Sequence, residues 1–307
     1  MVDLNAFPVK ESLRELLKDQ TTGKNIIFAT KAYSSDAQVI DETTPISIKI
    51  LRSLGPNAIQ PRVLRPQTEQ IARTRNKAEV FTPAWICNKM NNHCDIEWFG
   101  RTDIFNVEEG ERWNVINEVI PFPEGKSWKD YIESKRLEIT CGEAPYIVSR
   151  YDAATGIAIP VKNRIGLLDR KLRIINEHTK TERTWLSWVY KAYQSVYGYE
   201  FQGDNLLIAR INLLTTFTDY MQDRWKRKPS ASELKKITNI ITWNIWQMDG
   251  ITGTIPFSKP KQEFQQMSFF DYATGNNNER DENTFIDCRI MDWNTNRVIT
   301  FNSIKRG

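Results

Sequence analysis

The chain has 307 residues, of which 40% are apolar, and its formal net charge is +4. This length allows one large domain or two ordinary ones, and so mild a charge does not by itself indicate a nucleic-acid-binding protein. The sequence shows no apolar run that could span a bilayer and no basic-plus-apolar leader, so we expect a cytoplasmic protein that does not bind a membrane.

Cysteine and histidine are too few and too scattered to predict a metal centre. No two cysteines form a C-x-x-C pair, and His93 and Cys94 are adjacent, so they do not face one ion from a regular helix. The complete set is Cys87, Cys94, Cys141, Cys288, His93 and His178.

Residues 1–65 are predicted to form an N-terminal α+β cap. Leu13, Leu16 and Leu17 follow the spacing of a short helix. Strand-like runs follow at Ile26–Ala29 and Ile46–Ile50, separated by turns rich in Ser, Asp and Thr. Residues 66–307 are predicted to form a second, larger domain.

A basic stretch lies on a segment that is predicted to become helical after Pro66. Arg73, Arg75 and Lys77 are its last members. Such a stretch is typical of a solvated helix face, and it is also typical of a surface that contacts DNA phosphates. The sequence leaves both interpretations open.

The segment that follows predicts the start of a helix. Thr82 suits the N-cap and Pro83 the first helical position, directly after Phe81. The free amides at such a helix start favour a carboxylate ligand.

Residues 137–148 read as the end of a buried strand, a small-residue turn around Cys141 and Gly142, and the start of a second element. This is the layout of a first βα turn in a doubly wound sheet, where a cofactor lies against the main chain at the carboxyl end of the strand. Further on, the charged segment Arg164–Leu172 predicts a surface helix.

The region from 184 to 221 predicts helix, strand and helix in turn. The spacing is helical from Thr184 to Tyr197, a short buried strand follows, and Gly203-Asp204 then caps a helix over Asn205–Met221. Glu200 lies at the end of the strand, where an acid accepts hydrogen bonds from ribose hydroxyls in nucleotide-binding sheets. Because Gly142 precedes it by far more than the usual roughly 20 residues, we expect an insertion between them.

The last third contains three further predicted features. Ser230 and Glu233 form a capping box at a helix start, and Asn244–Gly250 reads as a strand that runs into a turn at Asp249. Residues 258–283 read as a long polar loop. Phe285–Trp293 reads as a strand that ends in the pair Asp292-Trp293.

In their order along the chain, these segments resemble the cofactor-binding segments of γ-type adenine-N6 DNA methyltransferases. The resemblance implies a cofactor, S-adenosylmethionine, held by residues from four segments. Phe81, Thr82 and Pro83 would close over its methionine end, and Glu200 would bind its ribose. Asp249 would hold its adenine amino group. The cofactor loop itself would contain Glu138, Cys141 and Gly142.

Two departures from the family pattern affect the chemistry. Ala144 and Pro145 stand where the family has its second glycine and the residue after it. These residues leave the main chain less room to approach the cofactor than glycine would. The chain also lacks the Asn/Asp/Ser-Pro-Pro-aromatic motif that binds the target amino group and stacks on a flipped base. Asp292 and Trp293 occupy the corresponding place as candidate catalytic residues.

The sequence therefore predicts a Rossmann-like class I methyltransferase sheet with an N-terminal α+β cap. The predicted function is that of a DNA adenine-N6 methyltransferase-like subunit of a restriction-modification or mobile-element system. The alternative is an inactive DNA-binding or cofactor-sensing scaffold that acts with a partner chain. A nuclease using Glu138, Asp249 or Asp292 is disfavoured, because no Asp/Glu-x-Lys pair follows a suitable acid.

Overall fold

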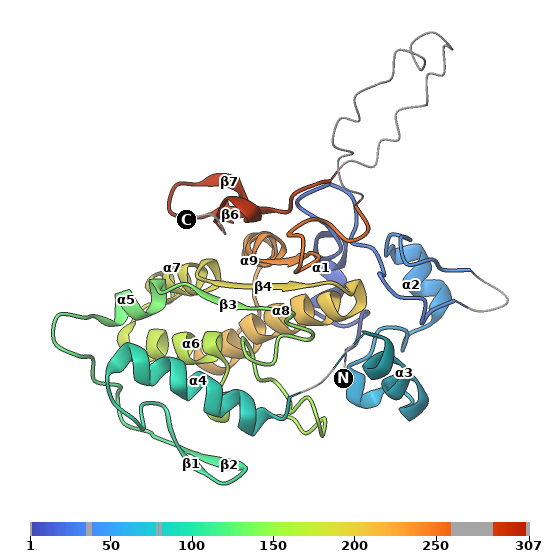
Figure 1. The fold of residues 1–307 in the computed structure, drawn as a ribbon. Coiled ribbons are helices and arrows are strands. Elements are labelled where there is room, and N and C mark those ends of the chain that lie inside the picture. Colours follow the sequence, from blue (N-terminus) through green and yellow to red (C-terminus); the bar gives the residue numbers. More distant parts are fainter. Residues whose placement is uncertain (1, 35–38, 78, 80–81, 259–284, 305–307) are drawn as a thin grey trace, which may run out of the picture.

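The chain folds into a mixed α/β structure (Figure 1), known here from a computed structural model that describes residues 2–34, 39–77, 79, 82–258 and 285–304. Its helices are α1 (Val9–Leu16), α2 (Ile48–Leu54), α3 (Gln67–Lys77), α4 (Ala84–Phe99), α5 (Trp128–Glu133), α6 (Leu167–His178), α7 (Glu182–Gln194), α8 (Gly203–Trp225), α9 (Ala231–Asn244) and α11 (Phe301–Ile304), with 3-10 turns η1 (Arg62–Leu64) and η2 (Val161–Asn163). Its strands are β1 (Asn106–Glu109), β2 (Arg112–Val115), β3 (Arg136–Glu138), β4 (Val196–Glu200), β5 (Ile245–Gln247), β6 (Arg289–Asp292) and β7 (Arg297–Thr300).

A three-stranded parallel sheet lies at the centre of the fold, in the order β3-β4-β5. Glu138 of β3 pairs with Gly198 of β4, and Glu200 at the end of β4 pairs with Gln247 of β5. Every residue of β4 is buried, as expected of the middle strand of a parallel sheet. The carboxyl ends of β3 and β4 therefore meet at one edge, where the candidate site lies.

The insertion that we expected between Gly142 and Glu200 is present. The turn η2 and the helices α6 and α7 all lie between β3 and β4 in the chain. Parallel neighbours require such a crossover, because the chain has to return to the starting edge of the sheet.

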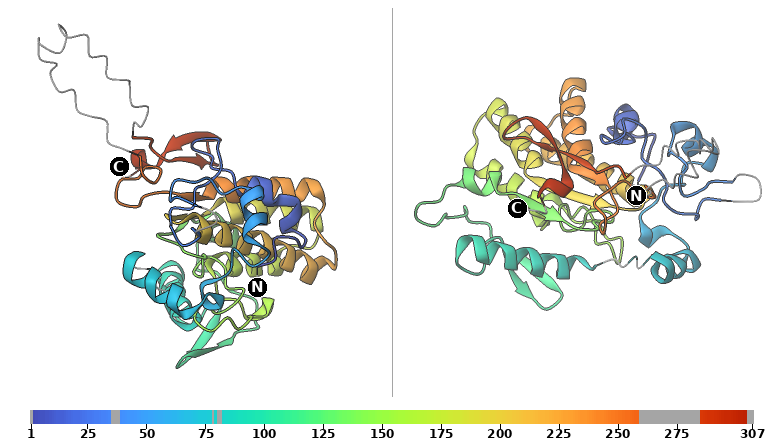
Figure 2. Two further views of the ribbon diagram at one scale, coloured as in Figure 1. Left: turned by 90° about the vertical axis from the view of Figure 1, so that its right-hand side faces the viewer. Right: turned by 45° about the horizontal axis from the view of Figure 1, so that its top comes forward.

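The N-terminal region shares one apolar core with the rest of the chain. A single cluster of buried side chains runs from Val2 through Phe28 to Ile245, and α8 is buried on nearly all sides. Helix α1 packs on α8 and α9, and both views in Figure 2 place the blue N-terminal segment beside these gold and orange helices.

Most predicted helices and strands are present, and three predictions are wrong. The run Ile26–Ala29 forms one isolated bridge, between Ile27 and Pro45, so the described part of residues 1–65 contains helices but no strand. The run Ile46–Ile50 is not a strand: Ser47 accepts a hydrogen bond from the Ile50 amide and thereby starts α2. The Ser47 side chain thus binds one of the amides that have no partner at the start of a helix. This local hydrogen bond favours a helix over a strand in this segment.

The charged helix predicted over Arg164–Leu172 is not on the surface. It begins at Leu167 as α6, and Asp169, Arg170 and Lys171 are all buried. Arg170 forms an ion pair with Asp95, and the Lys171 Nζ donates to the Ile132 carbonyl of α5 at 2.9 Å. Burial of charged groups is compatible with stability only where such partners exist, and the local sequence pattern does not reveal these partners.

Beyond the parallel sheet, β6 and β7 form an antiparallel hairpin. The predicted strand Phe285–Trp293 is thus shorter, and Ile290 packs against Tyr199 and Trp246 on one face of the sheet. The loop predicted over 258–283 lies almost entirely outside the described residues. Within the described part of the chain, no helix combines the length and apolarity that crossing a bilayer requires.

Candidate functional site

A cavity of about 1030 Å³ opens where β3 and β4 end. One wall is α4, the second is the turn after β3, and the third is the short segment between β4 and α8. Parallel sheets commonly bind ligands outside the carboxyl ends of their strands. This cavity, which we call the strand-end pocket, is therefore the candidate site.

Glu200 ties the end of the central strand to the turn that follows β3. Its carboxylate accepts hydrogen bonds from the Gly142 amide (2.8 Å) and from the Gln202 amide (3.0 Å). Only 6% of Glu200 is exposed, and burial raises its pKa to about 7 although the two amides favour the charged form. An ionised carboxylate accepts about four hydrogen bonds, so the ionised form of Glu200, which lines the strand-end pocket, has acceptor capacity beyond these two amides.

Glu138 uses its carboxylate to hold its own loop. It accepts hydrogen bonds from the amides of Tyr146 (3.4 Å) and Ile147 (3.1 Å). Burial raises the pKa of Glu138 to about 8, and the nearby charge of Glu200 acts in the same direction. Glu138 does line the strand-end pocket, but its main contacts fix the turn.

The turn after β3 has the left-handed backbone conformation that glycine favours, although one of its left-handed positions is occupied by an alanine. Gly142 has φ +53°, and Ala144 adopts φ +63° although it is not glycine. A left-handed alanine costs roughly 1–2 kcal/mol, so the fully buried surroundings of Ala144 hold it in this conformation. Cys141 packs against Gly198 of β4, because a Cβ built on Gly198 would lie 3.2 Å from the Cys141 Sγ.

The helix start expected near Thr82 is present, one residue later than predicted. Pro83 is the N-cap and α4 begins at Ala84, while Thr82 lines the strand-end pocket. The Ala84 amide donates to the Asp152 carboxylate at 2.7 Å. One amide that we expected to be free for a cofactor carboxylate is thus already bound. Phe81 lies outside the described residues.

Asp249 does not reach the strand-end pocket. Its carboxylate accepts hydrogen bonds from the amides of Ile251 (2.9 Å) and Thr252 (3.3 Å) and closes the turn after β5. Asp249 is absent from the residues that line the pocket. Asp249 therefore has a structural role in the turn, because an Asp side chain readily accepts hydrogen bonds from backbone amides two residues ahead.

Asp292 and Trp293 also lie away from the strand-end pocket. We placed them at the end of a predicted strand, in the position of the family's target-binding motif, but among the described strands β6 pairs with β7 alone, and does so antiparallel. Asp292 accepts a hydrogen bond from the Thr295 hydroxyl (2.7 Å), and the Trp293 indole donates to Asn244 (2.7 Å). The catalytic role that we assigned to them has no support in this arrangement.

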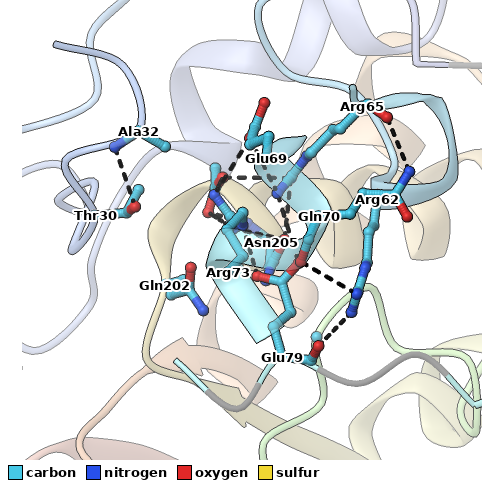
Figure 3. A network of polar contacts seen from close by, with 12 residues as sticks. Thr30, Ala32, Arg62, Arg65, Glu69, Gln70, Arg73, Glu79, Gln202 and Asn205 are labelled. Carbon is cyan, nitrogen blue, oxygen red and sulfur yellow. Dashed lines mark hydrogen bonds and ion pairs between the residues drawn. The ribbon is translucent and has the colours of Figure 1, made fainter. Parts of the chain in front are cut away.

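The predicted DNA-binding residues differ in exposure. Arg73 is buried and pairs with Glu79 (2.7 Å) and Asp204 (2.8 Å), in the network shown in Figure 3. Burial alone would raise the pKa of Asp204, but Arg65 and Arg73 bring it below its ordinary value. Arg75 is exposed on the same helix, and the side chain of Lys77 lies outside what the structure describes.

Sequence reasoning missed several residues of the strand-end pocket. Met90 of α4 and Tyr146 face it, with the Tyr146 hydroxyl 3.1 Å from the Met90 sulfur. Gln202 lines it as well, and its buried Oε1 has no hydrogen-bond partner among the described residues. The position of Gln202, two residues after the strand-end acid, was the available signal.

Among the described residues, no cluster of His, Cys, Asp and Glu side chains has the geometry of a metal site. No family model, no curated protein and no solved structure matches the chain.

Proposed function

We propose that the strand-end pocket binds S-adenosylmethionine and that the chain is a methyltransferase-like subunit of a DNA-modification system, with adenine N6 as the methyl acceptor. The observation that carries this proposal is the contact between Glu200 and the Gly142 amide. An acid at the end of the second strand and a tight turn after the first are the parts that hold a nucleoside in doubly wound sheets.

The residues of the pocket fit such a ligand in three respects. The cavity volume of about 1030 Å³ lies at the upper end of the usual range for ligand sites, roughly 300–1,000 Å³. Glu200 offers a carboxylate to ribose hydroxyls, and the unpartnered Oε1 of Gln202 offers a further acceptor. The bound cofactor would supply an activated methyl group on sulfur.

A second candidate is a subunit that binds the cofactor without transferring the methyl group. Asp292 and Trp293 favour it, because both lie outside the strand-end pocket and make structural contacts elsewhere.

Calorimetric titration with S-adenosylmethionine tests the binding proposal. We expect Glu200→Ala to weaken binding at least tenfold, because hydrogen bonds to a charged group contribute about 1.5–3 kcal/mol. The matched control is Asp249→Asn, an acid at the end of the neighbouring strand that does not line the pocket, and it should leave the affinity unchanged. Equal affinity of Glu200→Ala and wild type would reject the assignment.

Tritiated methyl transfer to mixed-sequence DNA then separates the two candidates. Binding together with transfer selects the active subunit, and binding alone selects the cofactor-binding subunit. Absence of both removes the proposed function and leaves only the fold.

A further inference from the structure

The carboxylates of Glu138 and Glu200 line the strand-end pocket without a cationic partner among the described residues. The hydrogen bonds that these two side chains accept all come from main-chain amides. Glu79, which lines the same pocket, differs from them because its carboxylate forms an ion pair with Arg73 at 2.7 Å. When Glu138 and Glu200 are ionised, their charges are therefore stabilised by amide dipoles alone.

The titratable groups that act on these two carboxylates do not supply a positive charge. Besides each other, the two carboxylates interact with acidic groups of β4, of the turn after β3, of α4 and α8, and of the segment before α4: Glu79, Cys87, Cys141, Tyr146, Tyr199 and Asp204. Arg65 and Arg73 pair with two of these acids. The basic residues that line the pocket, Lys89 and His93, are exposed on α4, where solvent screens their charge. The buried part of the pocket is thus suited to a ligand that carries a positive charge.

Gln202 provides a second, independent indication of a ligand in this pocket. It lines the pocket and is only 5% exposed, and its Oε1 has no hydrogen-bond partner among the described residues. A buried acceptor without a partner is unfavourable, because it has lost its hydrogen bonds to water. A ligand with hydrogen-bond donors as well as a positive charge would satisfy both Gln202 and the two carboxylates.

The ionisation of the two carboxylates makes the binding of a cation depend on pH. Burial raises the pKa of Glu138 to about 8 and that of Glu200 to about 7, so both side chains are largely protonated at pH 6. A cation beside them favours the ionised form, and its binding therefore releases protons. By linkage, the affinity for a cation rises as the pH rises from 6 to 8.

We propose that the strand-end pocket distinguishes S-adenosylmethionine from its demethylated counterpart, S-adenosylhomocysteine, by the positive charge of the sulfonium, and that Glu138 determines this specificity. The inference rests on the proposed function, which supplies the sulfonium ligand and assigns Glu200 to the ribose hydroxyls. The two ligands differ by one methyl group and by the charge that it places on sulfur. The neutral thioether loses the attraction to the Glu138 carboxylate, so it binds more weakly.

Calorimetric titration of the full chain with both ligands at pH 6 and pH 8 tests the proposal. At pH 8 we expect wild type to bind S-adenosylmethionine at least tenfold more tightly than S-adenosylhomocysteine, and this ratio should be smaller at pH 6. Glu138→Gln should lower the ratio at pH 8 at least threefold and weaken its change with pH, because glutamine keeps an acceptor oxygen but does not ionise. Its affinity for S-adenosylhomocysteine should stay within about twofold of wild type.

Two controls separate the Glu138 charge from other effects. Asp249→Asn removes an acid that does not line the pocket and should keep the wild-type ratio. The amino groups of the ligands titrate at about pH 8 as well, but they contribute equally in wild type and variants, so the comparison between proteins removes their effect. Binding of S-adenosylhomocysteine by Glu138→Gln shows that the variant is folded.

The outcomes distinguish this inference from the proposed function. If wild type binds S-adenosylmethionine but binds both ligands equally, charge discrimination is overturned and the proposed function stands. A ratio whose size and pH dependence are the same in Glu138→Gln and wild type likewise overturns the role of Glu138. Failure of the wild-type chain to bind S-adenosylmethionine at either pH overturns the cofactor assignment and, with it, this inference.

Discussion

At the scale of residues, the strand-end acids differ in what their carboxylates do. Glu138 and Glu200 are both buried at the pocket, but Glu138 holds the turn at Tyr146 and Ile147 while Glu200 joins the turn to the central strand. Sequence position placed both acids at strand ends, yet it did not indicate which amides they accept from. Apart from the Gln202 amide, which is close to Glu200 in the chain, these amides come from residues eight, nine and fifty-eight positions away, so only the folded loop determines them.

Glu138→Gln should remove part of the pH dependence of stability. The pKa of Glu138 is raised from 4.5 to about 8, so between these values the folded chain keeps a proton that the unfolded chain has released. The wild-type free energy of unfolding therefore falls as pH rises through this window, by up to about 1.4 kcal/mol per pH unit, and levels off above it. Glutamine does not titrate, so the variant should gain relative to wild type from pH 5 to pH 8.

Urea unfolding at several pH values between 5 and 8 measures this difference. Glu118→Gln, at an exposed position, is the control and should follow the wild-type profile. Parallel profiles for Glu138→Gln and wild type would show that Glu138 keeps an ordinary pKa in the folded chain.

At the scale of elements, the start of α8 is fixed by close packing against the N-terminal region. The Gly203 amide donates to the Phe28 carbonyl at 3.0 Å. A Cβ built on Gly203 would lie 1.9 Å from the Ile27 carbonyl oxygen. The segment that carries Glu200 and Gln202 is thereby held in place by residues from the predicted cap.

Gly203→Ala should therefore destabilise the protein by about 1–3 kcal/mol or more, because the obstructing atom is main chain and has little room to shift. Gly100→Ala provides a comparison: its Cβ would meet open space, and only the positive φ of 73° opposes it, at a cost of about 1 kcal/mol. Urea unfolding measures both. A smaller loss for Gly203→Ala than for Gly100→Ala would contradict the close approach.

At the scale of the whole molecule, sequence pattern predicted local structure better than it predicted neighbours in space. Helix spacing and the Ser230–Glu233 capping box are present as expected, because both depend on residues within a few positions. The buried charges of α6 were missed, since they depend on partners far along the chain, such as Asp95 for Arg170. The hairpin that contains Asp292 was missed for another reason: the sequence was read as a single strand, whereas Asp292 pairs with Arg297 just after it. Of the predicted site, the turn and Glu200 come together, while Asp249 and the pair Asp292-Trp293 do not.

The difference between local sequence pattern and neighbours in space also determines which residues of α3 are available to the proposed DNA partner. Arg73 and Arg75 lie two positions apart on one helix, yet Arg73 is buried against Glu79 and Asp204 while Arg75 is exposed. Removing one partner of a buried ion pair costs about 3–5 kcal/mol, so Arg73→Ala should destabilise the chain by that order. Arg75→Ala should change stability by less than about 0.5 kcal/mol, as exposed substitutions usually do.

DNA binding supplies the second readout for this matched pair. If α3 contacts DNA, Arg75→Ala should reduce the slope of log affinity against log salt by about 0.9, the value for one phosphate contact on a duplex. Measured at a temperature where both variants are folded, Arg73→Ala should keep the wild-type slope, because its guanidinium is committed to Glu79 and Asp204. An unchanged slope for Arg75→Ala would mean that the exposed side of α3 is an ordinary solvated helix face and that any DNA-binding surface lies on other elements.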